Sequence, residues 1–295
     1  MNSIVKQTSR KKAFTIIELL TVMSIIVILI GVLVPALNNV RRYAKKVKQK
    51  AQFNSIQAAI ELFNNENDGY PPSGAFDGVG QSYCGAMKLC EAMMGRDLLG
   101  FHPDSVFRAD GMDATNTRLV YPVPPTPENV SARLGTLLQF ENANAYRLGA
   151  DIYGSGNTGT FNENIFVLCD VYTRDMRTGK KTGMPILYYK ADTSNYLHDP
   201  NRPMDATDSG GNIYNFNDNQ ELVALGKPWE KAGTSSTTQH SLYYPARFYR
   251  NTRNNQIATV RRPYRTDSYI LISAGFDGEY GTADDICNFD WKYRE

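Results

Sequence analysis

The longest apolar run of the chain lies near its N-terminus, over residues 14–37. One ionisable residue, Glu18, interrupts this run, which also holds Gly31 and Pro35. About 20 residues at a rise of about 1.5 Å each cover the hydrocarbon core of a bilayer, so the pattern predicts a membrane-spanning helix. Pro35 lacks a backbone donor and is expected to kink this helix or melt one turn, although membrane helices also tolerate proline.

The predicted helix continues beyond the apolar run, through residues 38–66. Apolar side chains recur there at three- and four-residue steps, which is the spacing of one helix face. Two prolines and several turn-forming residues follow over residues 65–74 and end the helix. One helix from residue 14 to about residue 65 would be about 75–80 Å long. The stripe consists of Val40, Tyr43, Ala44, Val47, Ala51, Ile56, Ile60 and Phe63.

The remaining residues, 67–295, are expected to form one globular head. Strands are predicted where β-branched and aromatic residues gather. The expected fold class is α+β, in which the second half of the long helix packs on a C-terminal antiparallel sheet interrupted by large loops. We expect strands over residues 165–172, 185–190 and 269–274, short helices over 82–94 and 129–140, a polar hairpin loop over 174–183, and a long exposed loop over 199–241 with one helical turn near 220–225.

The segment before the apolar run is basic and has no acidic residue. A basic leader ahead of an apolar run is typical of a secretory signal peptide. The run is longer than the apolar part of such a peptide, however, and no small-residue cleavage site follows it. An uncleaved signal anchor explains charge and length equally well, but it leaves Glu18 unexplained. The basic residues are Lys6, Arg10, Lys11 and Lys12.

A carboxylate inside a membrane helix costs about 2.5 kcal/mol or more, so Glu18 should have a partner. Lys11-Lys12-Ala13 followed by Phe14-Thr-Ile-Ile-Glu18-Leu-Leu resembles the processing site of type IV pilins and of the pseudopilins of type II secretion. The resemblance implies that a prepilin peptidase cuts between Ala13 and Phe14 and methylates the new terminus of Phe14. It also implies that Glu18 pairs with the α-amino group of Phe14 on a neighbouring subunit, which makes the buried charge tolerable.

Two further features follow from this resemblance. The family usually has glycine before the cut, where this chain has Ala13. A proline near position 35 accompanies partial unwinding of the helix in the filament, so Pro35 joins Glu18 as an expected assembly residue. Retention of Glu18 also argues against the tip subunit of a pseudopilus, where this glutamate is typically absent.

Composition narrows the classes of function. The 295 residues carry a formal charge of +2, which becomes −2 when the four basic residues of the leader are removed, so nucleic acid is not an expected partner. Three histidines and the lack of a legible nucleophile, base and acid indicate that the chain is not an enzyme. Export would place the four cysteines in an oxidising compartment. Cys84 and Cys90 are close enough in sequence for a local disulfide, and free buried thiols are the open alternative.

A basic cluster follows the apolar run. Its side chains could contact anionic lipid headgroups or acidic surfaces of neighbouring subunits, and a solvated helix face explains them equally well. The cluster consists of Arg41, Arg42, Lys45, Lys46, Lys48 and Lys50.

An acidic, glycine-containing loop over residues 275–286 follows the last predicted strand. Its acids are Asp277, Glu279, Asp284 and Asp285. Calcium binds six to eight oxygens from carboxylates and backbone carbonyls, but the spacing is not that of an EF-hand. A hairpin with solvated acids explains the loop without a metal.

The pattern Asp277-Gly-x-x-Gly-Thr-x-Asp-Asp-Ile resembles the calcium loop of major type II secretion pseudopilins. This resemblance implies calcium ligands from the side chains of Asp277, Asp284 and Asp285 and from backbone carbonyls near Tyr280 and Thr282. Without the cation the acids would repel each other, so calcium should order the C-terminal segment.

The two resemblances together imply a pseudopilus subunit in the bacterial inner membrane, with a single span and a periplasmic head. Its expected partners are further copies of itself, minor pseudopilins, the prepilin peptidase, a platform protein and an assembly ATPase. Residues 74–265 do not resemble the shorter major pseudopilins. A type IV pilus subunit or minor pilin that acts as an adhesin or binds a ligand is therefore the alternative.

Overall fold

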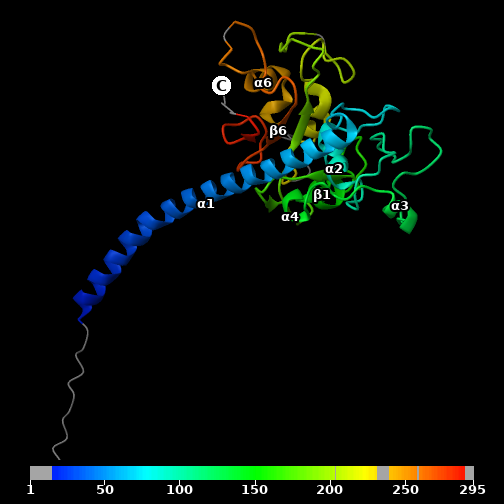
Figure 1. Ribbon diagram of the computed structural model, residues 1–295. Coiled ribbons are helices and arrows are strands. Elements are labelled where there is room, and N and C mark those ends of the chain that lie inside the picture. The colour runs from blue at the N-terminus through cyan, green and yellow to red at the C-terminus, as the bar shows by residue number, and fades with distance from the viewer. Residues whose placement is uncertain (1–14, 203, 231–238, 258, 290–295) are drawn as a thin grey trace, which may run out of the picture. The chain divides into compact units, whose positions relative to one another are not determined.

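The computed structural model describes residues 15–202, 204–230, 239–257 and 259–289. The chain divides into two compact units, Met1–Ala44 and Lys45–Glu295. Helix α1 (Ile16–Asn67) is 52 residues long and contributes to both units (Figure 1). The class is α+β, as predicted, with small antiparallel sheets.

The two parts of α1 differ in their surroundings. In the first unit, its apolar side chains are exposed. In the second unit, one face is buried, with residues at the three- and four-residue steps expected of an amphipathic helix. The second half of the predicted helix therefore packs on the head as expected. Its buried residues are Gln49, Gln52, Phe53, Ile56, Ala59, Ile60 and Phe63.

Two buried glutamines connect this face to the head through polar contacts. The Gln52 Nε2 amide donates hydrogen bonds of 2.9 Å to the carbonyl oxygens of both Asn142 and Cys169. One turn earlier, Gln49 Oε1 accepts a 2.9 Å bond from the Val171 amide. These bonds satisfy backbone groups that would otherwise be buried without partners beneath the helix.

Within the described residues, the head contains three antiparallel sheets. The largest has the order β5-β6-β7, with Leu187 opposite Ile272 and Ile272 opposite Cys287. Pairs β1-β2 and β3-β4 form the two smaller sheets, and β3-β4 is the predicted polar hairpin. The strands are β1 (Ala145–Arg147), β2 (Phe166–Leu168), β3 (Arg174–Asp175), β4 (Lys181–Thr182), β5 (Leu187–Lys190), β6 (Tyr269–Ser273) and β7 (Ile286–Cys287).

The central strand β6 is buried on both faces, which explains its continuous apolar sequence. Ile270 and Ile272 enter one core cluster, whereas Tyr269 and Leu271 enter the other. The second cluster also contains the buried face of α1, so the sheet separates α1 from the short helices on its far side. Alternate side chains of a strand point to opposite faces, so one short strand supports two cores.

Short helices cover the rest of the head. In α2, every residue is buried, and an added Cβ at Gly85 would lie 2.3 Å from the carbonyl oxygen of Tyr188. Only glycine therefore allows α2 to approach β5 this closely. The helices of the described residues, besides α1, are α2 (Gly85–Met94), α3 (Pro127–Ser131), α4 (Phe140–Ala143), the π-helix η1 (Leu148–Tyr153), the 3-10 helix η2 (Phe216–Asn219), α5 (Gln220–Ala224), the 3-10 helix η3 (Ser241–Tyr243) and α6 (Pro245–Asn251).

Cys84 and Cys90 do not form the disulfide that the sequence left open; both are free, buried thiols. Cys84 precedes α2 and joins the core cluster on one side of the sheet, whereas Cys90 joins the cluster on the other side. Six residues of helix turn the two positions to different faces, because each residue rotates the helix by about 100°. The geometry of α2 therefore keeps the two thiols apart.

The predicted helix over residues 129–140 is wrong for most of its length. Helix α3 ends at Ser131 and α4 begins at Phe140. Between them the Leu134 amide donates to the Phe101 carbonyl at 2.8 Å, and the Leu137 amide donates to the Met93 carbonyl at 2.9 Å. Backbone donors committed to distant segments cannot continue a helix, so tertiary contacts override the local propensity.

The described part of the predicted loop over residues 199–241 is only partly exposed, which corrects the prediction of a long exposed loop. Ile213, Tyr214 and Phe216 are buried in the core cluster that faces away from α1. The single predicted helical turn is confirmed by α5, which follows η2 directly. Sparse apolar residues among polar ones anchor this long connection to the head.

Candidate functional site

The predicted cleavage site, Ala13 and Phe14, lies outside the described residues. The first described residue, Thr15, and Glu18 form a capping box. The backbone amide and the hydroxyl of Thr15 donate to Glu18 Oε2 at 2.9 and 2.8 Å, and the Glu18 amide donates to Thr15 Oγ1 at 3.2 Å. This reciprocal arrangement satisfies donors at the start of α1. Glu18 therefore has a partner within its own chain, which the Thr-x-x-Glu pattern before an apolar run could have revealed.

The apolar part of α1 is long and apolar enough to cross a membrane. None of the residues in its most apolar window is buried within the chain. The polar side chains in this part are satisfied locally, because the Thr21 hydroxyl donates to the Ile17 carbonyl at 3.0 Å and the Ser24 hydroxyl to the Thr21 carbonyl at 2.8 Å. The helix is continuous through Pro35, so no turn melts there.

The basic cluster after the apolar part lies mainly on exposed positions of α1. Lys45 is half-buried, and its Nζ lies 5.9 Å from the ring centroid of Tyr172 and 6.0 Å from that of Phe276. A cation over aromatic rings gains about 0.5–1 kcal/mol at such exposed sites. Lys45 therefore has a structural role on the head, while the other basic side chains face solvent.

The acidic loop connects β6 to β7 and starts with a tight turn. Gly275 has φ of +64°, and an added Cβ would lie 2.3 Å from the Asp284 carbonyl oxygen. The Asp277 amide donates to Asp284 Oδ2 at 2.9 Å, and the Thr282 hydroxyl donates to Asp284 Oδ1 at 2.7 Å. These contacts bring Asp277 and Asp284 from opposite ends of the loop to one place.

The carboxyl groups of Asp277 and Asp284 affect each other's pKa. Burial, together with the neighbouring Asp284 carboxylate, raises the pKa of Asp277 to about 6. Hydrogen bonds from Thr282 and Asp277 outweigh burial at Asp284 and hold the pKa of that carboxyl below its usual range. Ionising both carboxyl groups would place two negative charges close together. A cation bound between them would stabilise the ionised forms.

The third predicted ligand points elsewhere. Asp285 is 5% exposed, and its Oδ2 accepts a 2.7 Å hydrogen bond from the Gly281 amide. Burial raises the pKa of Asp285 well above its usual value. Asp285 therefore holds the turn in its present form.

The predicted backbone ligands also have partners. The Tyr280 carbonyl accepts from the Leu242 amide at 3.0 Å, and the Thr282 carbonyl accepts from the Asp285 amide at 3.4 Å. Glu279, in contrast, forms a 2.7 Å ion pair with Lys227. Within the described ranges, no three histidine, cysteine or acidic side chains gather as a metal-ligand cluster. The Asp277–Asp284 pair is thus the part of the predicted calcium site that fits a cation, and further oxygens would have to come from backbone carbonyls.

A cation from the hairpin β3-β4 already lies near this pair. Arg174 Nη2 donates to the Phe276 carbonyl at 2.6 Å, and the guanidinium stacks on Trp229 with its central carbon 4.0 Å from the ring centroid. Burial lowers the pKa of Arg174, and the charges of Asp170, Asp277 and Asp284 offset part of this effect. The sequence did not indicate this contact, because Arg174 and the loop are about a hundred residues apart.

Comparisons with protein-family models, characterised proteins and solved structures found no match.

The described structure therefore has an exposed apolar helix whose first turn contains Glu18 in a capping box. The loop between β6 and β7 of its head contains the acidic pair Asp277 and Asp284. These features come from opposite ends of the sequence. Both agree in position with the sequence-based expectations, while the local partner of Glu18 and the arginine beside the acidic pair were not anticipated.

Proposed function

We propose that the chain is a structural subunit of a type II secretion pseudopilus. In this proposal a prepilin peptidase cuts between Ala13 and Phe14 and methylates Phe14. The apolar parts of α1 then pack together in a helical filament that drives protein export. The fold would be a pilin fold, with the span in the bacterial inner membrane and the head in the periplasm. The observation that carries the proposal is an exposed apolar helix with its single carboxylate in its first turn.

The contacts of Glu18 suggest how subunits would join. Both Thr15 bonds end on Oε2, and within the described residues Oε1 receives no hydrogen bond. Oε1 could then accept from the α-ammonium group of Phe14 on a neighbouring subunit without disturbing the capping box. In low dielectric such a pair is strongly attractive, which would fix the axial register of adjacent helices.

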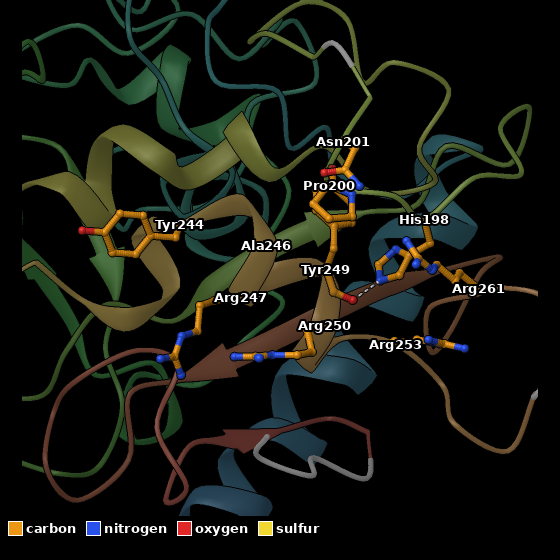
Figure 2. A pocket seen from close by; sticks show the side chains of 10 residues that line it. All are labelled: His198, Pro200, Asn201, Tyr244, Ala246, Arg247, Tyr249, Arg250, Arg253 and Arg261. Carbon is orange, nitrogen blue, oxygen red and sulfur yellow. Dashed lines mark hydrogen bonds between the residues drawn. The ribbon is translucent and has the colours of Figure 1, made fainter. Parts of the chain in front are cut away.

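Assembly requires partners that follow from the proposal. The filament would consist of further copies of this chain together with minor pseudopilins. An inner-membrane platform protein and an assembly ATPase would drive its assembly. No catalytic step is assigned to the chain itself. A surface type IV pilus subunit, or a minor pilin with a ligand-binding head, is the second candidate. A cavity of about 760 Å³ beside α6, whose lining includes Arg250, Arg253 and Arg261, favours it (Figure 2).

Processing provides the direct test of the proposed function. The protein would be extracted from membranes of cells with and without prepilin peptidase, and its intact mass and N-terminal sequence determined. We expect a chain that begins with methylated Phe14 only when the peptidase is present. A chain that retains Met1 in peptidase-positive cells would exclude the pilin pathway and leave a signal-anchored protein.

Calcium is proposed as the ligand of the Asp277–Asp284 pair. At a calcium concentration about 100-fold above the dissociation constant, binding stabilises the folded state by about 2.7 kcal/mol, which corresponds to about 5–10 °C in Tm for a head of this size. The full chain in detergent would be melted in calcium and in a chelator. We expect this shift for the wild type and for Asp267→Asn, a change at an exposed acid away from the loop, but not for Asp284→Asn. Equal melting in calcium and chelator would disprove a calcium site.

A further inference from the structure

Two cations from distant segments of the chain lie against the acidic loop. Lys227 Nζ forms the 2.7 Å ion pair with Glu279 Oε2, so that acid is neutralised by direct contact. Arg174, at the start of the hairpin β3-β4, lies against the part of the loop that holds Asp277 and Asp284. Among the described residues, these two acids form no ion pair of their own. The second cation therefore lies beside the acids that lack a direct basic partner.

The position of Arg174 is set by the segment 227–229. The guanidinium of Arg174 stacks on Trp229, with Cζ 4.0 Å from the ring centroid. The hairpin and this segment are joined through the backbone, because the Arg177 amide donates a 3.0 Å hydrogen bond to the Pro228 carbonyl. Stacking on an aromatic face holds a guanidinium without using its N–H donors. Arg174 is therefore held half-buried, with donors that can still reach the loop.

The loop backbone approaches this guanidinium closely on both sides of Asp277. Before Asp277, the Phe276 carbonyl accepts a 2.6 Å hydrogen bond from Arg174 Nη2. After it, Gly278 has φ of +72°, and an added Cβ would lie 2.5 Å from Arg174 Cζ and 2.7 Å from Trp229 Cη2. A side chain at this position would push the guanidinium away. Glycine is thus required for the contact with Arg174 as well as for the left-handed turn.

The charge of Arg174 acts on the acidic pair through space. Within the described residues, Arg174 takes part in no direct ion pair. Burial disfavours its charged form, and the carboxylates of Asp170, Asp277 and Asp284 act against burial to favour that form. Charges at a partly buried place interact more strongly than they do in water, because the effective dielectric constant is lower. The attraction is mutual, so Arg174 also stabilises the ionised acids.

We propose that Arg174 is the counter-ion of the Asp277–Asp284 pair and holds the loop between β6 and β7 in its folded form when no metal is bound. The fold then supplies the cation that the sequence led us to expect only from solution. The guanidinium would also lower the affinity of the loop for calcium, because two cations that share the same acids repel each other. The counter-ion role does not require calcium, and only the effect on calcium affinity rests on the function proposed above.

A double-mutant cycle in a chelator tests the counter-ion role without metal. Denaturant unfolding of the full chain in detergent would be measured for Arg174→Gln, for Asp277→Asn and for the two changes combined. Asparagine keeps the oxygen that accepts the 2.7 Å hydrogen bond from the Glu279 amide, so Asp277→Asn removes mainly charge. We expect Arg174→Gln to raise the equilibrium constant for unfolding about ten-fold. In the Asp277→Asn background this effect should be at least about three-fold smaller, whereas independent changes combine within about two-fold.

Two further variants separate charge from general damage to the hairpin. Lys181→Gln removes a cation from the same hairpin, but Lys181 Nζ lies 3.7 Å from the exposed carboxylate of Asp175 instead of against the loop. It should change the equilibrium constant for unfolding by less than about two-fold. Arg174→Lys keeps the charge and should be closer to the wild type than Arg174→Gln. Circular dichroism would verify that each variant is folded.

Two results in the chelator would overturn the proposal. An equal effect of Arg174→Gln with and without Asp277→Asn would assign the role of Arg174 to its stacking and hydrogen bonding. Arg174→Lys as unstable as Arg174→Gln would show that the positive charge does not matter.

Calorimetry with calcium chloride tests the effect on affinity. We expect Arg174→Gln to bind calcium about ten-fold more tightly than the wild type, and Lys181→Gln to bind it like the wild type. Calcium binding by Arg174→Gln that is unchanged or weaker would overturn the proposal, because a counter-ion must oppose a second cation. If neither the wild type nor Arg174→Gln binds calcium, the proposed calcium site fails, and the cycle in the chelator alone decides whether Arg174 is the counter-ion.

Discussion

Cells that produce Glu18→Gln as their only copy of the chain should contain processed subunits in the membrane but at least about a hundred-fold fewer assembled filaments. Glutamine can still accept the Thr15 bonds and retain the capping box, but it cannot supply the negative charge. Loss of one partner of a buried ion pair costs about 3–5 kcal/mol, and a tenfold change in affinity corresponds to about 1.4 kcal/mol. Sheared filaments, quantified by immunoblot and electron microscopy, provide the measurement.

Two further variants separate the charge from the helix cap. Glu66→Gln makes the same chemical change at an exposed position near the other end of α1 and should assemble normally. Thr15→Ala removes the cap, which costs about 0.5–2 kcal/mol at one end of a 52-residue helix, and should also assemble. Normal filament amounts from Glu18→Gln would show that the charge is not needed, and loss from Thr15→Ala would assign the effect to the cap.

The second large effect is expected at the buried glutamines of α1. Gln52→Ala leaves the Asn142 and Cys169 carbonyls without a donor, and Gln49→Ala leaves the Val171 amide without an acceptor. Each change should lower the free energy of unfolding of the head by about 1–3 kcal/mol, and the double variant by more. This is a large share of the about 5–15 kcal/mol that stabilises a typical domain. Denaturant unfolding of the full chain in detergent, followed by tryptophan fluorescence, would report the loss.

Gln57→Ala serves as the matched control, because Gln57 lies on the same helix and is partly exposed. It should change the free energy of unfolding by less than about 0.5 kcal/mol. If Gln49→Ala and Gln52→Ala had equally small effects, apolar contacts such as those of Phe53 and Ile56 would account for the attachment of the helix to the head.

The sequence predicted elements whose pattern is local and continuous. Helix α1 follows from an uninterrupted apolar run and the helical stripe after it, and β6 follows from an unbroken apolar stretch that both faces of a strand can bury. Residues 132–139 belong to a predicted helix but contain Gly135, and the amides of Leu134 and Leu137 bond to distant carbonyls instead. No local pattern contains that information, because the competing partners are remote in sequence.

The candidate site was predictable to a similar extent. Asp277 and Asp284 lie within one short loop, so their proximity follows from sequence spacing. Whether a carboxylate points into a loop or caps its turn depends on backbone geometry, and Asp285 does the latter. Arg174 and the acidic loop come from segments about a hundred residues apart, and only the fold brings them together.

The free thiols have a consequence for the lifetime of the head in an oxidising compartment, where the proposed function would place it. Burial raises the pKa of Cys84 to about 12, so at pH 7 only about one molecule in 10⁵ carries the reactive thiolate there. Oxidants and thiol reagents can therefore react with Cys84 only when the fold opens. The rate at which Cys84 and Cys90 are modified would therefore report how often the head opens. Modification as fast as that of an unfolded peptide would contradict this protection.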